Sequence, residues 1–397
     1  MQPVRLSRAL TLLFAITAGF AVGNLYWAQP LLELIGSDLG VSSGAAGWLL
    51  TVTQAGYALG ILLLVPLGDL LNRRRLVPVI LLCSAAALAL CALAPTYGTL
   101  LAAIGLLGLT TVSGQIIVPL AGDLADPAER GRVVGTVVSG VLTGILVSRT
   151  ISGLVAGAAG WRVIYAAAAV AAVVFAVLLY RAIPALPAKT TVRYPALLAS
   201  VATIIARERT VRWSLVRGAI QFATFTMFWT ALTFLLSAPP FSYDVDVIGL
   251  FGLIGLAGAI AAQRAGGLLD RGWAMPATGA GWALALASFA LAGFAEQSLA
   301  LLIAGILLLD VAIQSLNILN QTRLFAVSHA ARSRLNTAMV TANFIAGAIG
   351  SAAAGILWSA GGWAAVTTAG IVLTVAGLIM WAAGRRGPLL VPGQVAS

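Results

Sequence analysis

The stretch RGRVVGTVVSGVLTGILVSRTISGLVAGAAGW occupies residues 130–161, and a stretch of the same design, RSRLNTAMVTANFIAGAIGSAAAGILWSAGGW, occupies residues 332–363. Each begins with two arginines around a small residue, continues as a long apolar run rich in glycine and alanine, and ends in Gly-Trp. Similarity at a fixed period marks an internal repeat. In an apolar chain, two halves repeated in the same direction predict a transporter whose site lies between the halves.

The composition indicates a membrane protein. Of the 397 residues, 60% are hydrophobic and 9% are charged, and the mean hydropathy is +1.02, whereas soluble domains carry about 25% charged residues. The net charge of +11 does not indicate a nucleic-acid partner, because the basic residues lie in short loops between apolar runs, which is the positive-inside pattern. Cys83 and Cys91 fall in one predicted helix about 12 Å apart, which is too far for a disulfide.

Since about 20 apolar residues cross a bilayer, the hydropathy pattern predicts an all-α polytopic membrane protein with twelve transmembrane helices. Two pseudo-symmetric six-helix bundles are expected, at 1–183 and 211–386, with a Pro-rich basic linker at 184–210 and a short tail at 387–397. The bias of arginine between loops predicts that both termini are cytoplasmic. The predicted spans are 9–35, 44–71, 76–94, 98–124, 132–159, 162–183, 212–237, 246–269, 275–294, 297–323, 334–359 and 363–383.

Two basic motifs close the second and eighth spans: GDLLNRRR at 68–75 and GGLLDRG at 266–272. They resemble the major facilitator superfamily, whose loop between helices 2 and 3 has the form G-x-x-x-D-R-x-G-R-R, with a weaker copy between helices 8 and 9. In the first copy the acid follows the glycine directly, and asparagine holds its usual place. The resemblance implies the major facilitator fold and a cytoplasmic latch, because charges at helix ends pair with each other and with helix dipoles; topology anchoring alone is the alternative. The latch candidates are Gly68, Asp69, Arg73, Asp270 and Arg271.

A charge inside the predicted fifth helix is the first candidate for function. Residues 148–153 (SRTISG) lie where the proton-coupled drug antiporters of this superfamily carry G-P-x-x-G-G, and Arg149 replaces the proline. A charge near the bilayer centre costs roughly 2.5–3.5 kcal/mol or more. Arg149 is therefore predicted to face a cavity or a partner and to take part in proton coupling, the alternative being that it snorkels to the interface.

The predicted tenth helix carries a polar stripe. Asp310, Gln314, Asn317 and Gln321 recur at the spacing of one helical face. Facing lipid, this stripe would be prohibitively costly, so it must line a cavity or another helix. Asp310 could take a proton, bind substrate or neutralise Arg149; a purely structural hydrogen-bonded stripe is the alternative.

The predicted first helix adds a second resemblance. NLYWAQPLL at 24–32 is similar to an N-x-Y-Y-x-Q-P-L-L signature of bacterial sugar-efflux and drug-efflux members. In the superfamily, helices 1, 4, 7 and 10 line the central cavity, so the resemblance nominates substrate-binding residues on each of them, although aromatic residues at helical spacing also serve packing. Outside the tenth helix these candidates are Asn24, Tyr26, Gln29, Thr111, Ser113, Gln115, Gln221, Phe225 and Trp229.

Asp123, near the cytoplasmic end of the predicted fourth helix, is a further proton-coupling candidate. The alternative for this acid is a helix-end ion pair with Arg130 or Arg132. Only Asp310, Arg149 and Asp123 are nominated for proton coupling.

The resemblance favours a secondary transporter that exports a small organic solute, drug-like or sugar-like, by alternating access with proton antiport. Proton-coupled uptake or a facilitated carrier is the alternative. An intramembrane enzyme is a distant one, since the only histidine, His329, falls in a predicted loop and no catalytic constellation is visible. The expected partners are the solute, protons and a lipid bilayer, with no nucleic acid, no cofactor and no metal. The expected form is a monomer in a bacterial inner membrane, and the sparsely charged stripe suggests a neutral or amphipathic solute.

Overall fold

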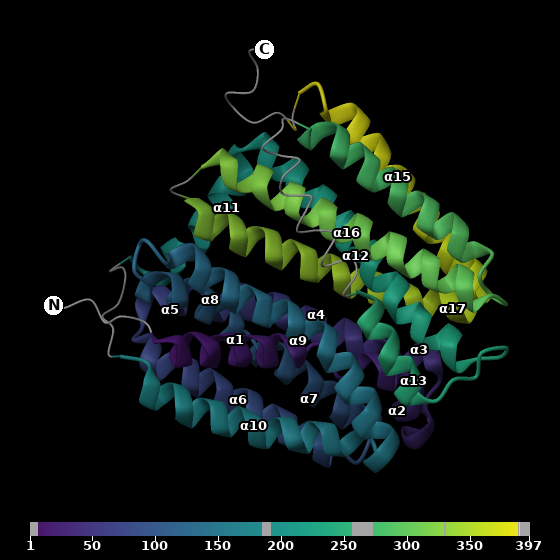
Figure 1. The fold of residues 1–397 in the computed structure, drawn as a ribbon, viewed down its shortest axis with the longest axis horizontal. Coiled ribbons are helices and arrows are strands. Elements are labelled where there is room, and N and C mark those ends of the chain that lie inside the picture. Colours follow the sequence, from purple (N-terminus) through teal and green to yellow (C-terminus); the bar gives the residue numbers. More distant parts are fainter. Residues whose placement is uncertain (1–6, 185–191, 256–272, 329–330, 388, 390–397) are drawn as a thin grey trace. The chain divides into compact units, whose positions relative to one another are not determined.

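The computed structural model describes residues 7–184, 192–255, 273–328, 331–387 and 389, and all regular structure in them is helical (Figure 1). The elements of the first half are α1 (Arg8–Gly23), η1 (Gln29–Leu31), α2 (Leu32–Leu39), α3 (Ser43–Ala46), α4 (Trp48–Leu64), α5 (Leu67–Leu70), α6 (Arg73–Leu93), α7 (Tyr97–Thr110), α8 (Ser113–Leu124), α9 (Arg130–Ala159) and α10 (Trp161–Ala182). Those of the second half are α11 (Tyr194–Arg207), α12 (Arg209–Ser237), α13 (Val245–Leu250), η2 (Phe251–Ile254), α15 (Ala274–Gly293), α16 (Leu299–Val327) and α17 (Arg332–Gly384).

Nine helices of the described part are long and apolar enough to cross a membrane, counted by length and composition. One of them, α17, contains two predicted spans, because non-helical backbone at Gly361 and Gly362 divides it. The first predicted span is divided into three shorter helices, α1, η1 and α2. The fourth is divided into α7 and α8. The eighth begins as α13 and η2 and continues into residues 256–272, outside the described part.

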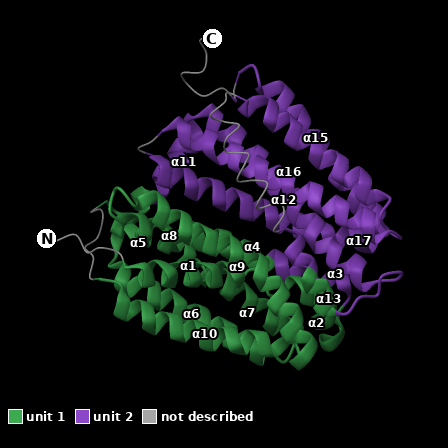
Figure 2. Ribbon diagram, in the orientation of Figure 1, with its two compact units in different colours: residues 1–41, 52–197, 245–250 green, residues 42–51, 198–244, 251–397 purple. Residues whose placement is uncertain are grey.

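The chain forms two compact units, which Figure 2 colours separately. Unit 1 is residues 1–41, 52–197 and 245–250, and unit 2 is residues 42–51, 198–244 and 251–397. Each unit therefore takes in a short segment from the other half of the sequence. These two segments are counterparts, because one opens the second span and the other opens the eighth.

Glycine lets both segments pack closely against a long helix. In unit 1, a Cβ on Gly153 of α9 would lie 2.6 Å from the carbonyl oxygen of Val245 and 3.0 Å from Cα of Gly249. In unit 2, a Cβ on Gly355 of α17 would lie 2.7 Å from the carbonyl oxygen of Gly44. Small residues allow helix backbones to approach this closely. The repeated apolar run thus makes the same kind of crossing in each unit.

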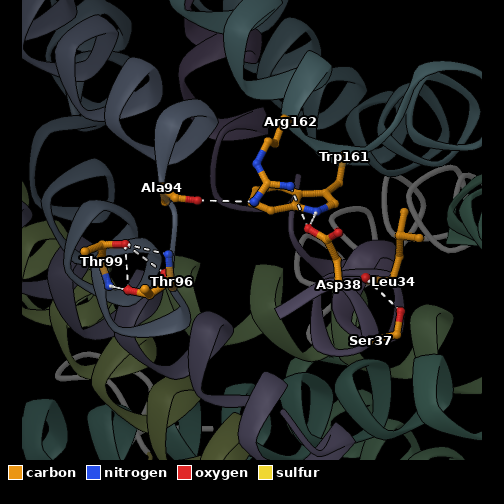
Figure 3. A network of polar contacts seen from close by, with 8 residues as sticks. All are labelled: Leu34, Ser37, Asp38, Ala94, Thr96, Thr99, Trp161 and Arg162. Atoms are coloured by element: carbon orange, nitrogen blue, oxygen red, sulfur yellow. Dashed lines mark hydrogen bonds and ion pairs between the residues drawn. The ribbon is translucent and has the colours of Figure 1, made fainter. Parts of the chain in front are cut away.

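The Gly-Trp corners of the repeat also take the same form. Gly160 has φ +88° and Gly362 has φ +61°, a backbone region open to glycine at little cost. Each glycine precedes a tryptophan whose indole N–H is hydrogen-bonded. Trp161 donates to the Asp38 carboxylate at 3.0 Å, as Figure 3 shows, and Trp363 donates to the carbonyl oxygen of Ala292 at 2.7 Å.

The predicted linker contains a helix, α11, which opens at Tyr194-Pro195 and ends at the basic Arg207. Its Val201 belongs to a buried apolar cluster of unit 2 with Val211 and Leu215 of α12. The linker therefore packs on the bundle that follows it through at least one apolar side chain.

Candidate functional site

In unit 1, the predicted first and fourth spans are both interrupted, and the interruptions are hydrogen-bonded to each other. Asn24 ends α1, and its Nδ2 donates to Thr111 Oγ1 at 3.0 Å, while Thr111 Oγ1 donates to the carbonyl oxygen of Ala21 at 2.6 Å. A continuous helix was predicted over 9–35, and this was wrong. Pro30 lacks an N–H for the carbonyl of Tyr26 and restricts Gln29, which accounts for the far end of the interruption, and at its near end Asn24 has a buried partner. Irregular backbone inside a span is typical of binding sites.

The segment between α1 and η1 is further held by buried polar side chains. Trp27 Nε1 donates to Asn24 Oδ1 at 2.7 Å, and Ser152 Oγ of α9 donates to the carbonyl oxygen of Trp27 at 2.6 Å. The amide of Asn24 is thus engaged on both sides. Its part in any site is to shape the interruption, since both ends of the amide already have partners.

Arg149 of α9 lies buried against this segment, with 3% of its surface exposed. Its Nε donates to Gln29 Oε1 at 2.6 Å, and its guanidinium carbon lies 4.8 Å from the centre of the Tyr26 ring. A hydrogen bond and a cation–π contact both offset the cost of burying the charge. Arg149 therefore has partners inside unit 1, as the sequence predicted. The alternative, that its side chain reaches out to the membrane interface, was wrong, because the side chain is buried.

Two further candidates of unit 1 lie on or beside the fourth span. Gln115 of α8 is half-buried, and its Nε2 donates to the hydroxyl of Tyr57, a fully buried residue of α4. Ser113 is fully buried at the start of α8. Tyr57 was missed from the sequence, because an aromatic residue in an apolar run carries no signal until its hydroxyl finds a partner.

The latch candidates at the end of the second span partly assemble. Arg73 donates to Asp123 Oδ2 at 2.6 Å, with the arginine side chain 7% and the aspartate side chain 40% exposed. Gly68 packs against Ile116 of α8, and Asp69 lies in the first turn of α5. The predicted alternative, in which Asp123 pairs with Arg130 or Arg132, was wrong, because the arginine that pairs with Asp123 is Arg73, and Arg132 pairs with Glu129. Asp270 and Arg271 lie outside the described residues, as does His329.

In unit 2, the acid of the polar stripe is buried. Asp310 of α16 is 2% exposed, and its Oδ1 accepts a hydrogen bond from Trp229 Nε1 of α12 at 3.2 Å. Trp229 lies 6.3 Å from Phe225 between ring centres. Gln221, two turns before Trp229, donates from Nε2 to the carbonyl oxygen of Ile313 at 2.8 Å. Trp229 and Gln221, two substrate-binding candidates of the predicted seventh span, thus contact the predicted tenth span.

The rest of the stripe is less buried than its acid. Gln314, Asn317 and Gln321 are all half-buried, whereas Asn320, one position away from the stripe, is 1% exposed. The stripe therefore has one buried acidic end and a more open amide end.

Outside the spans, the charged cluster of Figure 3 shows the effect of local partners on an acid. Arg162 donates to Asp38 Oδ2 at 2.6 Å and to the carbonyl oxygen of Ala94 at 3.2 Å. The hydrogen bonds from Arg162 and then Trp161 lower the pKa of Asp38 below its usual value of 3.8. This cluster lies at the surface and ties α2 to α10. Among the described residues, no group of three or more His, Cys, Asp and Glu side chains could hold a metal ion.

The comparisons with known proteins agree with one another. The sequence model of the Major Facilitator Superfamily matches residues 12–351. The chain is 42% identical over 376 residues to a protein named "Uncharacterized transporter YgaY" of Escherichia coli O157:H7, covering 95% of each. It is 35% identical over 368 residues to "Probable transporter SCO4007" of Streptomyces coelicolor, covering 91% of this chain and 85% of that protein.

Among solved structures, the chain is similar to a bacterial homolog of the human lysosomal transporter Spinster in an inward-facing and occupied conformation. The TM-score is 0.80 at 14% sequence identity, over 95% of this chain and 96% of that one. At that level of identity the likeness concerns the fold.

Proposed function

We propose, from the premise that the chain belongs to the Major Facilitator Superfamily, that it exports a small organic solute by alternating access in exchange for protons. Membership makes it a multi-pass membrane transporter of small molecules rather than an enzyme, and its bacterial relatives place it in an inner membrane. The proposal adds the direction, the proton and the residues. It also includes a monomeric form, and it includes cytoplasmic termini, which the arginines of the predicted cytoplasmic loops support.

The observation that carries the proposal is the carboxylate of Asp310, buried within a membrane-spanning helix. Ionisable groups at such depth are expensive and mark ion or substrate pathways. A carboxylate can accept a proton at one side of the membrane and release it at the other, with no other change in covalent structure. The Trp229 indole donates to Oδ1 of Asp310, and a carboxyl oxygen can accept this hydrogen bond whether the acid is ionised or protonated.

The solute would bind beside this acid, on side chains of the seventh and tenth spans. Gln314, Asn317 and Gln321 present donors and acceptors, and Phe225 with Trp229 offers an aromatic surface. Gln221 already bonds to the Ile313 carbonyl and would fix the spacing of the two helices. This combination suits an amphipathic solute, since ligand pockets combine an apolar lining with a few placed polar groups.

In unit 1, Arg149 would act on coupling through the segment it holds. Its contacts with Gln29 and Tyr26 fix the side chains that the first span presents. A solute or proton that changed those contacts would change the interruption at Asn24. Asp123 was also nominated from the sequence for proton coupling, but its ion pair with Arg73 supports a latch at the cytoplasmic end of unit 1 instead.

One observation favours the alternative of proton-coupled uptake. The G-P-x-x-G-G sequence of the antiporters is replaced here at residues 148–153, where Arg149 stands in place of the proline. Proline disrupts helix hydrogen bonding, and α9 is continuous through this position. The direction of transport is therefore part of the test.

The test is a proteoliposome assay with a pH-sensitive dye inside and a panel of sugars, nucleosides and drugs outside. Wild-type protein is expected to move protons when one solute is added, with a sign that gives the direction. Asp310→Asn keeps the size of the side chain and should abolish solute-driven proton movement. Glu296→Gln, at an exposed acid, is the matched control and should behave as wild type. Proton movement that survives intact in Asp310→Asn overturns the role of that residue.

A further inference from the structure

Two arginines lie buried side by side in unit 2, away from Asp310. Arg217 of α12 is 1% exposed and Arg323 of α16 is 5% exposed. Arg217 is hydrogen-bonded to Asn320 of α16, which precedes Arg323 by three residues, about one helical turn. Neither was nominated from the sequence, because each falls near the end of a span, where an arginine is expected to anchor topology. Their burial is the observation that separates them from anchoring arginines.

The polar contacts of this pair leave donors unused. Arg217 Nη2 donates to Asn320 Oδ1 at 2.9 Å, and Asn320 Nδ2 donates to the carbonyl oxygen of Ser214 at 3.0 Å. The Nη1 atoms of Arg217 and Arg323 and the hydroxyl of Ser214 are buried without a hydrogen-bond partner among the described residues. Neither arginine forms an ion pair within the described part of the chain.

This arrangement needs a negative charge. Burying one charged group without a counter-charge is costly, and two like charges in one low-dielectric site add repulsion. Guanidinium does not lose its proton in proteins, so neutralisation of the arginine is not open. Asp310 lies on the same helix as Arg323 but thirteen residues earlier, about 20 Å along the axis, and cannot supply the charge.

The third helix of the cluster adds an amide. Asn343 of α17 is 8% exposed, and its Oδ1 lacks a hydrogen-bond partner among the described residues. A Cβ on Gly218 would lie 2.9 Å from Asn320 Nδ2 and 2.9 Å from Asn343 Oδ1. Glycine therefore keeps the two amides in place against α12, and any larger residue would displace them from the arginine pair.

We infer that α12, α16 and α17 of unit 2 form a binding site for an oxyanion group, a carboxylate or a phosphate, that bridges Arg217 and Arg323. Guanidinium groups recognise such groups through paired N–H donors. Ser214 supplies a hydroxyl beside them, and Asn320 holds Arg217 in place. The site is distinct from the proposed proton site, and its occupant is an anion in solution or the anionic part of a solute.

The experiment measures binding without transport, so its failure is separate from failure of the proton-exchange proposal. Purified full-length protein in detergent is titrated with inorganic phosphate and, separately, with succinate, with chloride as the reference at constant ionic strength. Melting is followed by tryptophan fluorescence, and phosphate binding is measured directly with radiolabelled phosphate. Wild type should show a saturable rise in melting temperature with at least one oxyanion, and the two ligands separate phosphate from carboxylate recognition.

Matched variants test whether the oxyanion binds at Arg217 and Arg323. Arg217→Gln and Arg323→Gln should each lose the ligand-dependent shift and the bound label, while Arg334→Gln, at an exposed arginine of α17, should keep both. Arg217→Lys and Arg323→Lys retain the charge and cover the case in which a glutamine variant fails to fold; they should bind at least tenfold more weakly. No saturable binding by wild type, or an equal shift in all the variants, overturns the proposal. Binding that appears only in Asp270→Asn also overturns it, because a carboxylate of the chain would then be the occupant.

Discussion

The two units treat buried charge in different ways. In unit 1, Arg73 is paired with Asp123 at 2.6 Å, and Arg149 with Gln29 and the ring of Tyr26. In unit 2, Arg217 and Arg323 are buried together without an ion pair among the described residues, and the carboxylate of Asp310 lies farther along the same helix as Arg323. Unit 1 therefore has one buried arginine paired with an acid and one held by an amide and an aromatic ring, whereas the two buried arginines of unit 2 have no ion pair among the described residues.

The contrast extends to the repeated corners. Trp161 and Trp363 occupy matching places in the two halves, but Trp161 donates to the carboxylate of Asp38 and Trp363 to a backbone carbonyl. The backbone design is shared, while the acid is present only in unit 1. An internal repeat preserves the packing that both bundles need and permits the charges to differ. Because the repeat conserves packing and not charge, residues that bind ligands are best sought where the units differ in charge, and we look first in unit 2.

The largest expected effect separates two aspartates. Asp310→Asn should reduce solute-driven proton movement in proteoliposomes to the level of empty liposomes, while Asp123→Asn should keep the coupling, because Asp123 is already paired with Arg73. Both variants are measured with equal amounts of reconstituted protein. Loss of coupling in Asp123→Asn with retention in Asp310→Asn would reverse the contrast between the units.

The next effect is on stability. Arg149→Ala removes a charge-assisted hydrogen bond and leaves Gln29 Oε1 without that donor, so we expect a loss of about 2–3 kcal/mol in the free energy of unfolding. Arg130→Ala, at an exposed arginine of the same helix, should change it by less than about 0.5 kcal/mol. Denaturant unfolding in detergent, followed by tryptophan fluorescence, gives both values. Equal effects of the two changes would show that the Gln29 and Tyr26 contacts add nothing.

A smaller loss is expected at the ion pair of unit 1. Asp123→Ala leaves the buried Arg73 without its acid, which costs about 1–3 kcal/mol for an unsatisfied buried group; the lower part of that range applies because Asp123 is partly exposed. The reversed pair, Arg73→Asp with Asp123→Arg, should recover part of the loss in the same unfolding measurement. A reversed pair no more stable than the single variant would mean that the two charges do not interact.

The arrangement of spans was open to prediction because long apolar runs and glycine at Gly160 and Gly362 are local signals. The interruption at Asn24 was not, because it depends on Thr111, brought there by another helix. The partner of Asp123 was mistaken for a similar reason. Arg130 and Arg132 are near in sequence, but Arg73 is the residue that the fold brings to it.

For the candidate site as well, some residues could be predicted from the sequence and others required the fold. Asp310 and its stripe could be found by helical spacing alone, whereas the contact of Asp310 with Trp229 required the pairing of α12 with α16. Arg217 and Arg323 were hidden because sequence gives the depth of a charge only roughly. Burial decides between an arginine that anchors a loop and one that needs a counter-charge.

The smallest effect is expected at the exposed pair of unit 1. Hydrogen bonds from Arg162 and Trp161 lower the pKa of Asp38 in the folded state below its usual value of 3.8. A lowered folded-state pKa gives stability that is present above the unfolded pKa and lost as pH falls through the folded pKa. Asp38→Asn should therefore melt slightly below wild type at neutral pH, and the gap should narrow as the pH falls from 3.8 toward the lower folded-state pKa. Melting curves between pH 7 and pH 3, with Glu296→Gln as the control for an exposed acid, measure this gap. A gap that stays constant across that range would show that Asp38 contributes through shape and neutral hydrogen bonds, and the charge contrast between the units would then rest on the buried groups alone.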